Sequence, residues 1–138
     1  MVDDDTRVDT KADLEKIVLI AFSNPSQAQY VEAIARQQGY SPQRFDTSAE
    51  LLAEIERLES INAHYKIIME PAASRYATHI GPASQVNNAL KETGKNPQQI
   101  LRAVTQYSEM ENKCGEENPG IKCIYGYTND NEFRKFLD

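Results

Sequence analysis

The chain has 138 residues, a formal net charge of -6 and a sequence pI near 5.0. This length fits one domain that can bury a hydrophobic core without the help of disulfides or metal ions. The acidic balance argues against a protein that works mainly by neutralising nucleic-acid phosphates, and the longest apolar run, Ile17 to Phe22, is far too short to cross a bilayer. We therefore expect a soluble, cytoplasmic protein without a membrane partner.

The N-terminal residues 1–14 are rich in aspartate and carry few apolar side chains. Such a segment cannot bury enough apolar surface to fold alone. The aspartates are Asp3, Asp4, Asp5, Asp9 and Asp13. We expect a flexible acidic leader, followed by a single α/β domain over residues 15–138.

The first predicted strand, Lys16 to Phe22, is apolar on both faces, which is typical of the interior of a parallel sheet. Asn24 then fits the N-cap of a helix, with Pro25 at the first helical position and Gly39 at the end. The apolar face of this helix consists of Ala28, Val31, Ile34 and Ala35. These signals predict a strand that leads directly into a helix.

A second strand-helix pair follows. The run "YSPQRF" is a weaker strand, and its Pro42 favours an edge position. Thr47 and Glu50 have the spacing of a capping box before an apolar helical face. That face consists of Leu51, Leu52, Ile55 and Leu58. A third strand, Tyr65 to Glu70, is then stopped by Pro71.

About fifty residues separate this third strand from the next apolar run, "IKCIYGYT". They contain one helix pattern that ends at Gly94 and a second that begins with Asn96 as cap and Pro97 at the first position. The inward positions are Val86, Ala89 and Leu90 in the first helix, then Ile100, Leu101, Val104 and Tyr107 in the second. The sequence thus predicts an open, mostly parallel four-stranded α/β sheet of the flavodoxin or receiver type, with a helical insertion over about residues 82–113 and a last amphipathic segment.

Cys114 and Cys123 are the only cysteines, and neither belongs to a CxxC motif or has a histidine at metal-ligand spacing. Two reduced, buried thiols are expected, because a disulfide needs an oxidising compartment that nothing in the sequence indicates. We expect neither a metal nor a cofactor.

The order and spacing of these elements resemble the receiver domain of bacterial response regulators. The resemblance rests on "GYSPQRFDTSAELLAEI", on "IIMEP" at the third strand and on "IKCIYGYT" at the place of the fourth strand with its terminal Thr or Ser. It covers about Lys16 to Glu70 and then Ile121 to Asp138. It implies a signalling domain with a receiver-like fold.

Three departures from the receiver family bear on activity. Receivers hold Mg²⁺ with an acidic pair after the first strand, where this chain has Ser23 and Asn24. Their phosphorylated aspartate is replaced by Glu70, whose side chain is one methylene longer and often imitates a phosphorylated aspartate. The chain also ends before a predicted fifth strand, so that the family's lysine has no counterpart. The resemblance therefore implies a pseudo-receiver that has lost the phosphorylation chemistry.

Polar side chains gather in the loops that follow the strands. The candidate ligand- or anion-binding residues are Ser23, Asn24, Ser26, Glu70, Arg75, His79 and Thr128. A helix N-terminus attracts anions, although simple capping by Asn24 and Ser26 explains the same pattern. The glycine-rich loop of nucleotide-binding proteins is missing. A Ser23, His79 and Glu70 triad lacks the glycines of a nucleophile elbow, and His64 lies before the third strand, at the opposite edge.

The segment "QVNNALKETGKNPQQILRAV" has a faint helix-turn-helix pattern with Lys91, Lys95 and Arg102 as its basic residues. Its turn spacing is off by one residue, and the chain is acidic overall, so nucleic-acid binding is not favoured. A protein-binding arm is the plainer interpretation.

Aromatic residues cluster near the last strand and the last helix. The interface candidates are Tyr107, Tyr125, Tyr127 and Phe133. Receivers dock partners through the face built by their fourth strand and neighbouring helices, and an open sheet edge favours a protein partner or a second copy of the chain. We expect a non-catalytic signalling or adaptor domain, with a small enzyme or small-anion binder as the alternative and a nucleic-acid-binding regulator as the third possibility.

Overall fold

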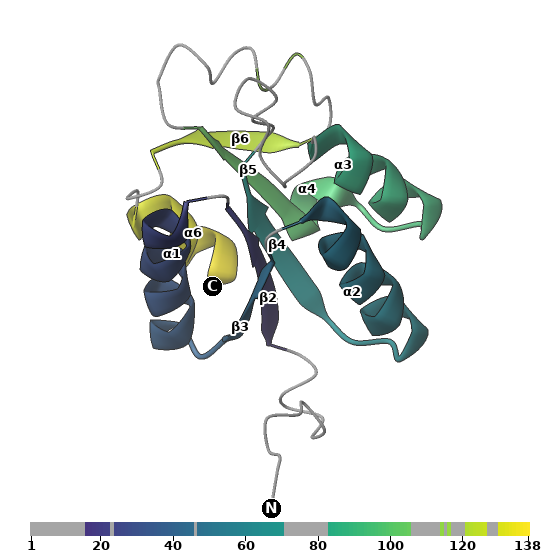
Figure 1. The fold of residues 1–138 in the computed structure, drawn as a ribbon, viewed down its shortest axis with the longest axis horizontal. Coiled ribbons are helices and arrows are strands. Elements are labelled where there is room, and N and C mark those ends of the chain that lie inside the picture. The colour runs from purple at the N-terminus through teal and green to yellow at the C-terminus, as the bar shows by residue number, and fades with distance from the viewer. Residues whose placement is uncertain are drawn as a thin grey trace, which may run out of the picture.

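The computed structural model describes residues 16–22, 24–45, 47–70, 83–105, 114, 116, 121–126 and 130–138. Within these ranges, five parallel strands form one sheet in the order β3-β2-β4-β5-β6 (Figure 1). The strands are β2 (Ile17–Ala21), β3 (Ser41–Phe45), β4 (Tyr65–Met69), β5 (Leu101–Thr105) and β6 (Lys122–Tyr125). The helices are α1 (Pro25–Gln37), α2 (Ser48–Ser60), α3 (Ala83–Glu92), α4 (Pro97–Ile100) and α6 (Asp130–Leu137).

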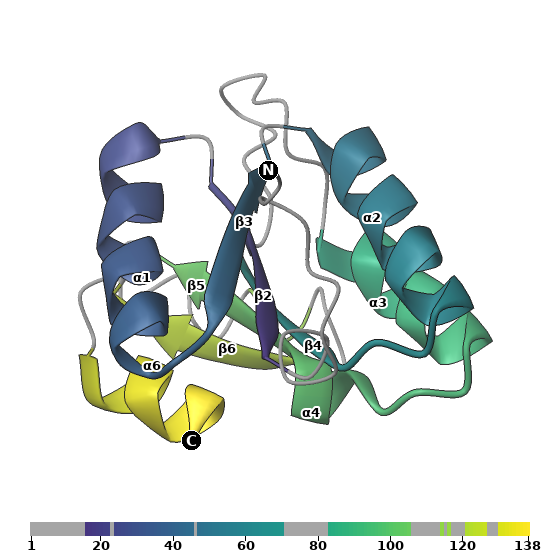
Figure 2. The same ribbon diagram turned by 90° about the horizontal axis from the view of Figure 1, so that it is seen from below.

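Helices cover both faces of the sheet, so the molecule has three layers. Helices α1 and α6 lie on one face, and α2 and α3 lie on the other (Figure 2). All five residues of β2 are buried, as expected for an interior strand between two helical layers. The predicted α/β class is therefore confirmed.

Two helix starts follow the predicted capping chemistry. The Asn24 Oδ1 atom accepts a hydrogen bond from the Ser26 N–H at 2.9 Å, and Pro25 is the first residue of α1. At α2, the Thr47 Oγ1 atom accepts from the Glu50 N–H at 3.2 Å, and the Thr47 hydroxyl donates to the Glu50 carboxylate at 3.0 Å. The bonds from the Ser26 and Glu50 N–H groups satisfy backbone donors that have no partner within the helix.

Strand β3 lies at one edge of the sheet, as its proline predicts. The Ser41 N–H donates to the Lys16 carbonyl at 2.8 Å and therefore points toward β2. Successive backbone N–H groups alternate in direction along a strand, so the nitrogen of Pro42 faces away from β2. The outer side of β3 thus lacks a donor at this position.

Residues 101–105 correct the prediction of a second inserted helix. The predicted cap is present, since the Asn96 side chain accepts from the Gln98 N–H at 3.0 Å and Pro97 begins α4, but the helix ends at Ile100. The chain continues as β5, which pairs with β4 on one side and β6 on the other. The inserted arm over residues 82–113 is therefore absent from the described residues: α3 belongs to an ordinary crossover, and "IKCIYGYT" contains the fifth strand in chain order, β6.

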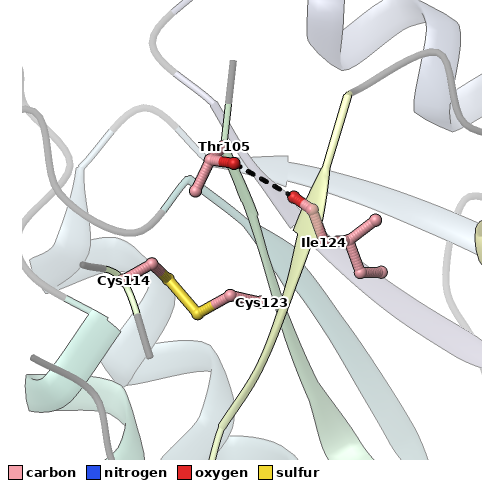
Figure 3. The surroundings of a disulfide bond; sticks show 4 residues. All are labelled: Thr105, Cys114, Cys123 and Ile124. Atoms are coloured by element: carbon pink, nitrogen blue, oxygen red, sulfur yellow. Dashed lines mark hydrogen bonds between the residues drawn. A yellow bond between two sulfur atoms is a disulfide. The ribbon is translucent and has the colours of Figure 1, made fainter. Parts of the chain in front are cut away.

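Cys114 and Cys123 form a disulfide, which corrects the prediction of two reduced thiols (Figure 3). Their Cα atoms lie 6.2 Å apart, within the range that a disulfide spans. Cys114 is buried in the core beneath α2 and α3, and Cys123 on β6 packs against the same core. The bond joins the segment between β5 and β6 to the second residue of β6.

Candidate functional site

The direction in which the chain adds strands to the sheet reverses between β2 and β4. The chain leaves β2 for β3 on one side and then crosses to β4 on the other side. In open α/β sheets, ligands bind outside the carboxyl ends of the strands at such a switch point. The Glu70 N–H donates to the Ala21 carbonyl at 3.1 Å, so Glu70 follows β4 directly beside the end of β2. Asn24 and Glu70 are thus the described candidates that flank the switch point.

Asn24 and Ser26 are both exposed at the first turn of α1. The hydrogen bond between them uses the amide oxygen of Asn24 and one of the N–H groups that an anion would need. This turn contains no acidic side chain. Capping therefore accounts for Asn24, while anion binding at this helix end stays a prediction.

Thr105 lies at the carboxyl end of β5. The sequence does not predict it as a ligand-binding residue, because residues 101–105 are predicted as part of a helix. The residue is 2 % exposed, and its hydroxyl donates to the Ile124 carbonyl at 3.4 Å (Figure 3). The Gly126 N–H donates to the Thr105 carbonyl at 2.8 Å. Because β5 is the fourth strand in chain order, Thr105 lies at the end of that strand. The resemblance to receivers predicts Thr128 at this position. A threonine closing the short apolar run "LRAVT" is the signal that could have found Thr105.

The remaining candidates divide into two groups. Ser23, Arg75, His79, Thr128, Tyr107 and Tyr127 lie outside the described residues. Of the described interface candidates, Tyr125 on β6 is 47 % exposed, whereas Phe133 on α6 is 0 % exposed. Phe133 is therefore a core residue and offers no surface to a partner, which corrects its place among the interface candidates.

Two further hypotheses depend on the described residues. The helix-turn-helix interpretation is wrong for residues 85–104, because α3 is followed by the four-residue α4 and then by a strand. Across the ranges that the structure describes, no group of three or more His, Cys, Asp or Glu side chains could hold a metal ion. His64 is exposed and directly precedes β4, at the amino edge of the sheet.

Cations that stand at the amino edge of the sheet hold the end of α6. The Lys66 ammonium donates to the carbonyl of Phe136, in the last turn of the helix, and lies 4.9 Å from the centroid of the Phe136 ring. The Arg102 guanidinium lies 4.2 Å from the same centroid. A cation at a helix C-terminus interacts favourably with the carbonyl end of the dipole. These basic side chains therefore have a structural role.

Partial burial of Lys66 and Arg102 disfavours their charged forms and lowers the pKa of both side chains. Burial lowers the pKa of Lys66, and the nearby positive charges of Arg102 and Lys16 lower it further, while Asp138 acts in the opposite direction. Burial likewise lowers the pKa of Arg102, against the charge of Glu132. Both of these perturbed cations thus lie at the amino edge of the sheet, opposite the edge that carries the switch point.

Tyr65, at the same edge, gives a pH-dependent prediction. Burial raises the pKa of its phenol, and the hydrogen bond to the Glu59 carboxylate at 2.5 Å raises it further. Above about pH 10 the unfolded chain loses this proton while the folded chain retains it, so stability falls as the pH rises. The Tyr65→Phe variant lacks this proton. The free energy of unfolding, measured by urea titration from pH 9 to pH 11, should therefore fall more steeply for the parent chain than for the variant; parallel curves would contradict the assignment.

The strand order β3-β2-β4-β5-β6, parallel throughout and covered by helices on both faces, defines a Rossmann-like α/β fold of the flavodoxin type. No protein-family model matches the chain, and no curated protein sequence matches it. Among solved structures, the chain is similar to the solution NMR structure of a de novo designed Rossmann 2x3 fold protein, with a TM-score of 0.55 and 14% sequence identity. The match covers 87% of this chain and 83% of the designed chain. At this identity, the likeness shows the fold alone.

Within the described ranges, none of the helices is both long enough and apolar enough to span a membrane.

Proposed function

We propose that this chain is a non-catalytic adaptor domain, which binds other proteins through a receiver-like scaffold that has lost the phosphorylation residues. The strand order supports the proposal, because receivers share this order with other flavodoxin-like sheets. The corrected strand assignment also supplies a fifth strand, which the resemblance to receivers requires.

The residues at the strand ends support the loss of phosphorylation. The acidic pair of a receiver is replaced by Ser23 and Asn24, and its aspartate by Glu70. Thr105 agrees with the family's threonine, but Gly126 follows β6, at the strand end that corresponds to the family's lysine. Of these strand-end positions, Thr105 alone carries the residue that receivers use. Phosphoryl transfer needs the metal ligands and the nucleophile together, so this match does not restore the reaction.

The observation that carries the proposal is the way these polar groups are used. The Asn24 side chain caps α1, and the Thr105 hydroxyl bonds to the backbone of the neighbouring strand. Both groups complete the architecture. Side chains that serve a reaction are normally aimed at the space a substrate would occupy, so this arrangement favours a scaffold that binds through its surface.

Strand β6 is the surface that we assign to the partner. It lies at the edge of the described sheet, and Tyr125 is its most exposed large apolar residue. Tyrosine is enriched in protein interfaces because it offers a large contact area and a polar end. The partner is a protein that adds an extended segment to this edge, and a second copy of the chain is one such partner.

Phosphorylation tests the catalytic half of the proposal. The purified protein is incubated with acetyl phosphate and Mg²⁺, with a working receiver as the positive control, and both are followed by intact-protein mass spectrometry. We expect a phosphoryl adduct on the control and none on this chain. An adduct that depends on Glu70, and is lost in the Glu70→Gln variant, would overturn the proposal.

A pair of surface variants tests the binding half. Tyr125→Lys places a charge on the β6 edge, while Ile61→Lys places the same charge at the equally exposed C-terminus of α2. In quantitative affinity capture, supplemented by sedimentation of the purified chain, the Tyr125 variant should lose at least about tenfold of partner or self-association relative to the Ile61 variant. Equal binding by the two variants would contradict the assignment of β6.

A small-anion binder is the second candidate, because the exposed first turn of α1 lies at the switch point. Thermal-shift measurements with inorganic phosphate test it. A concentration-dependent rise in melting temperature that the Asn24→Ala variant loses would favour this function over the adaptor.

A further inference from the structure

The disulfide fastens the edge strand β6 to the core. Cys114 lies in the chain between β5 and β6, is 3 % exposed and belongs to the cluster beneath α2 and α3. Cys123, nine positions later, is the second residue of β6 and is half-buried. Figure 3 shows the bond reaching from the segment that carries Cys114 to the strand.

Within the described residues, the other contacts of β6 include its pairing with β5 and the ion pair of Lys122 with Glu132 of α6 at 3.2 Å. The strand is four residues long and, in the described part of the chain, pairs with one neighbour, β5. Ile124 is its one fully buried side chain, while Lys122 and Tyr125 are exposed. Short edge elements with few buried contacts open at a lower free energy than the centre of a sheet does.

The helix that follows β6 has its own anchors. Tyr30 donates from its hydroxyl to Asp130, and Arg134 donates to the side chains of Gln37 and Gln38, which ties α6 to α1. Lys66 holds the other end of α6. Loss of the disulfide therefore weakens the attachment of β6 without removing the contacts that hold α6.

We propose that the Cys114–Cys123 bond is a redox-controlled clasp: its reduction loosens β6 locally and leaves the rest of the sheet folded. The proposal concerns the attachment of β6 and holds whether or not β6 binds a partner. The two cysteines differ in access, since Cys123 is half-buried and Cys114 is almost fully buried. Attack is therefore directed to the Cys123 sulfur.

The reductant is a dithiol. One of its thiolates attacks the Cys123 Sγ atom, which forms a mixed disulfide and releases Cys114 as a thiolate that takes up a proton. The second thiolate of the reductant then attacks the reductant's own sulfur in the mixed disulfide and releases Cys123, which is also protonated. Two electrons pass to the protein, and the dithiol becomes a disulfide. Two thiols replace the bond that held β6.

Amide hydrogen exchange, read by NMR, tests the clasp on the full chain with and without dithiothreitol, after thiol titration has established the oxidised and reduced states. The probes are the amides of Ile124 and Gly126, which face β5 because the Gly126 N–H donates to the Thr105 carbonyl and strand N–H groups alternate in direction. The references are the amides of Leu19 and Ile68 in β2 and β4. On reduction, exchange of the β6 amides should accelerate at least about tenfold more than that of the reference amides. The Cys114→Ala/Cys123→Ala variant should exchange like the reduced chain and should not respond to dithiothreitol.

Three results would overturn the proposal. Equal acceleration of all amides would mean that the disulfide stabilises the fold as a whole. Unchanged exchange at β6 would mean that the strand needs no clasp. Two free thiols in the protein purified under air, without reductant, would mean that the bond does not form. If the double variant fails to fold, the comparison of oxidised and reduced parent chain still decides among these results.

Discussion

Replacement of Ala103 by glutamate should prevent the chain from folding. Ala103 is fully buried in the middle of β5, where its backbone lies in register with Met69 of β4 and Cys123 of β6. An ionised carboxylate at this position has no partner and displaces apolar contacts on both sides. The expected loss is at least about 4 kcal/mol, comparable with the whole stability of a domain of this size. Circular dichroism and urea titration would detect the loss of the cooperative transition.

The matched control is Gln99→Glu, which introduces the same carboxylate at an exposed position of α4. Its stability should stay within about 0.5 kcal/mol of the parent chain. Ala103 also discriminates between two structures. In the helix that the sequence predicts, the inward face consists of Ile100, Leu101, Val104 and Tyr107, and Ala103 lies outside it. If the Ala103→Glu variant unfolds cooperatively with the stability of the parent chain, the result would favour the predicted helix and contradict the assignment of β5 as a strand.

Phe133→Ala should cost about 3–5 kcal/mol, the usual range when a buried phenylalanine is truncated. Phe133 is fully enclosed between the sheet and the helices of its own face, in the cluster that contains Val18, Ile20 and Val31. Truncation leaves a cavity that these rigidly packed neighbours fill only in part. The free energy of unfolding from urea titration is the measurement.

Lys135→Ala is the control for Phe133, because Lys135 is an exposed residue of the same helix. Its effect should stay within about 0.5 kcal/mol. The variant also separates a core role from an interface role. If Phe133→Ala kept the parental stability and instead lost a protein partner, the burial described for Phe133 would be contradicted and the interface prediction would be restored.

Local signals in the sequence predicted the helix starts well. The caps at Asn24, Thr47 and Asn96 depend on hydrogen bonds that span two or three residues, so the spacing of a few side chains determines them. The edge position of β3 follows equally from Pro42. These features need no knowledge of the rest of the fold.

The identity of residues 101–105 depends on distant partners. A run of Leu, Arg, Ala, Val and Thr, with apolar side chains at three of its five positions, fits both a buried strand and one face of a helix. The edge of β4 decides between them, because Ile67 and Met69 pair with Leu101 and Ala103. Once β5 is a strand, the helical insertion disappears and the fifth strand is present.

The candidate site was predicted less completely for the same reason. Asn24 and Glu70 follow strands that the sequence identified, and both lie beside the switch point. Thr105 was missed together with its strand, and the disulfide was missed because nothing in the sequence indicates an oxidising compartment. Burial of Phe133 likewise depends on α6 packing against α1 and the sheet.

The two edges of the sheet differ in their capacity to accept another strand. Pro42 removes an outward-facing donor from β3, whereas the four residues of β6 contain no proline. A sheet that could grow from both edges would form open-ended ribbons. If copies of this chain associate through β6, as proposed above, the missing donor on β3 disfavours growth from the opposite edge, and association would then stop at two copies related by a twofold axis.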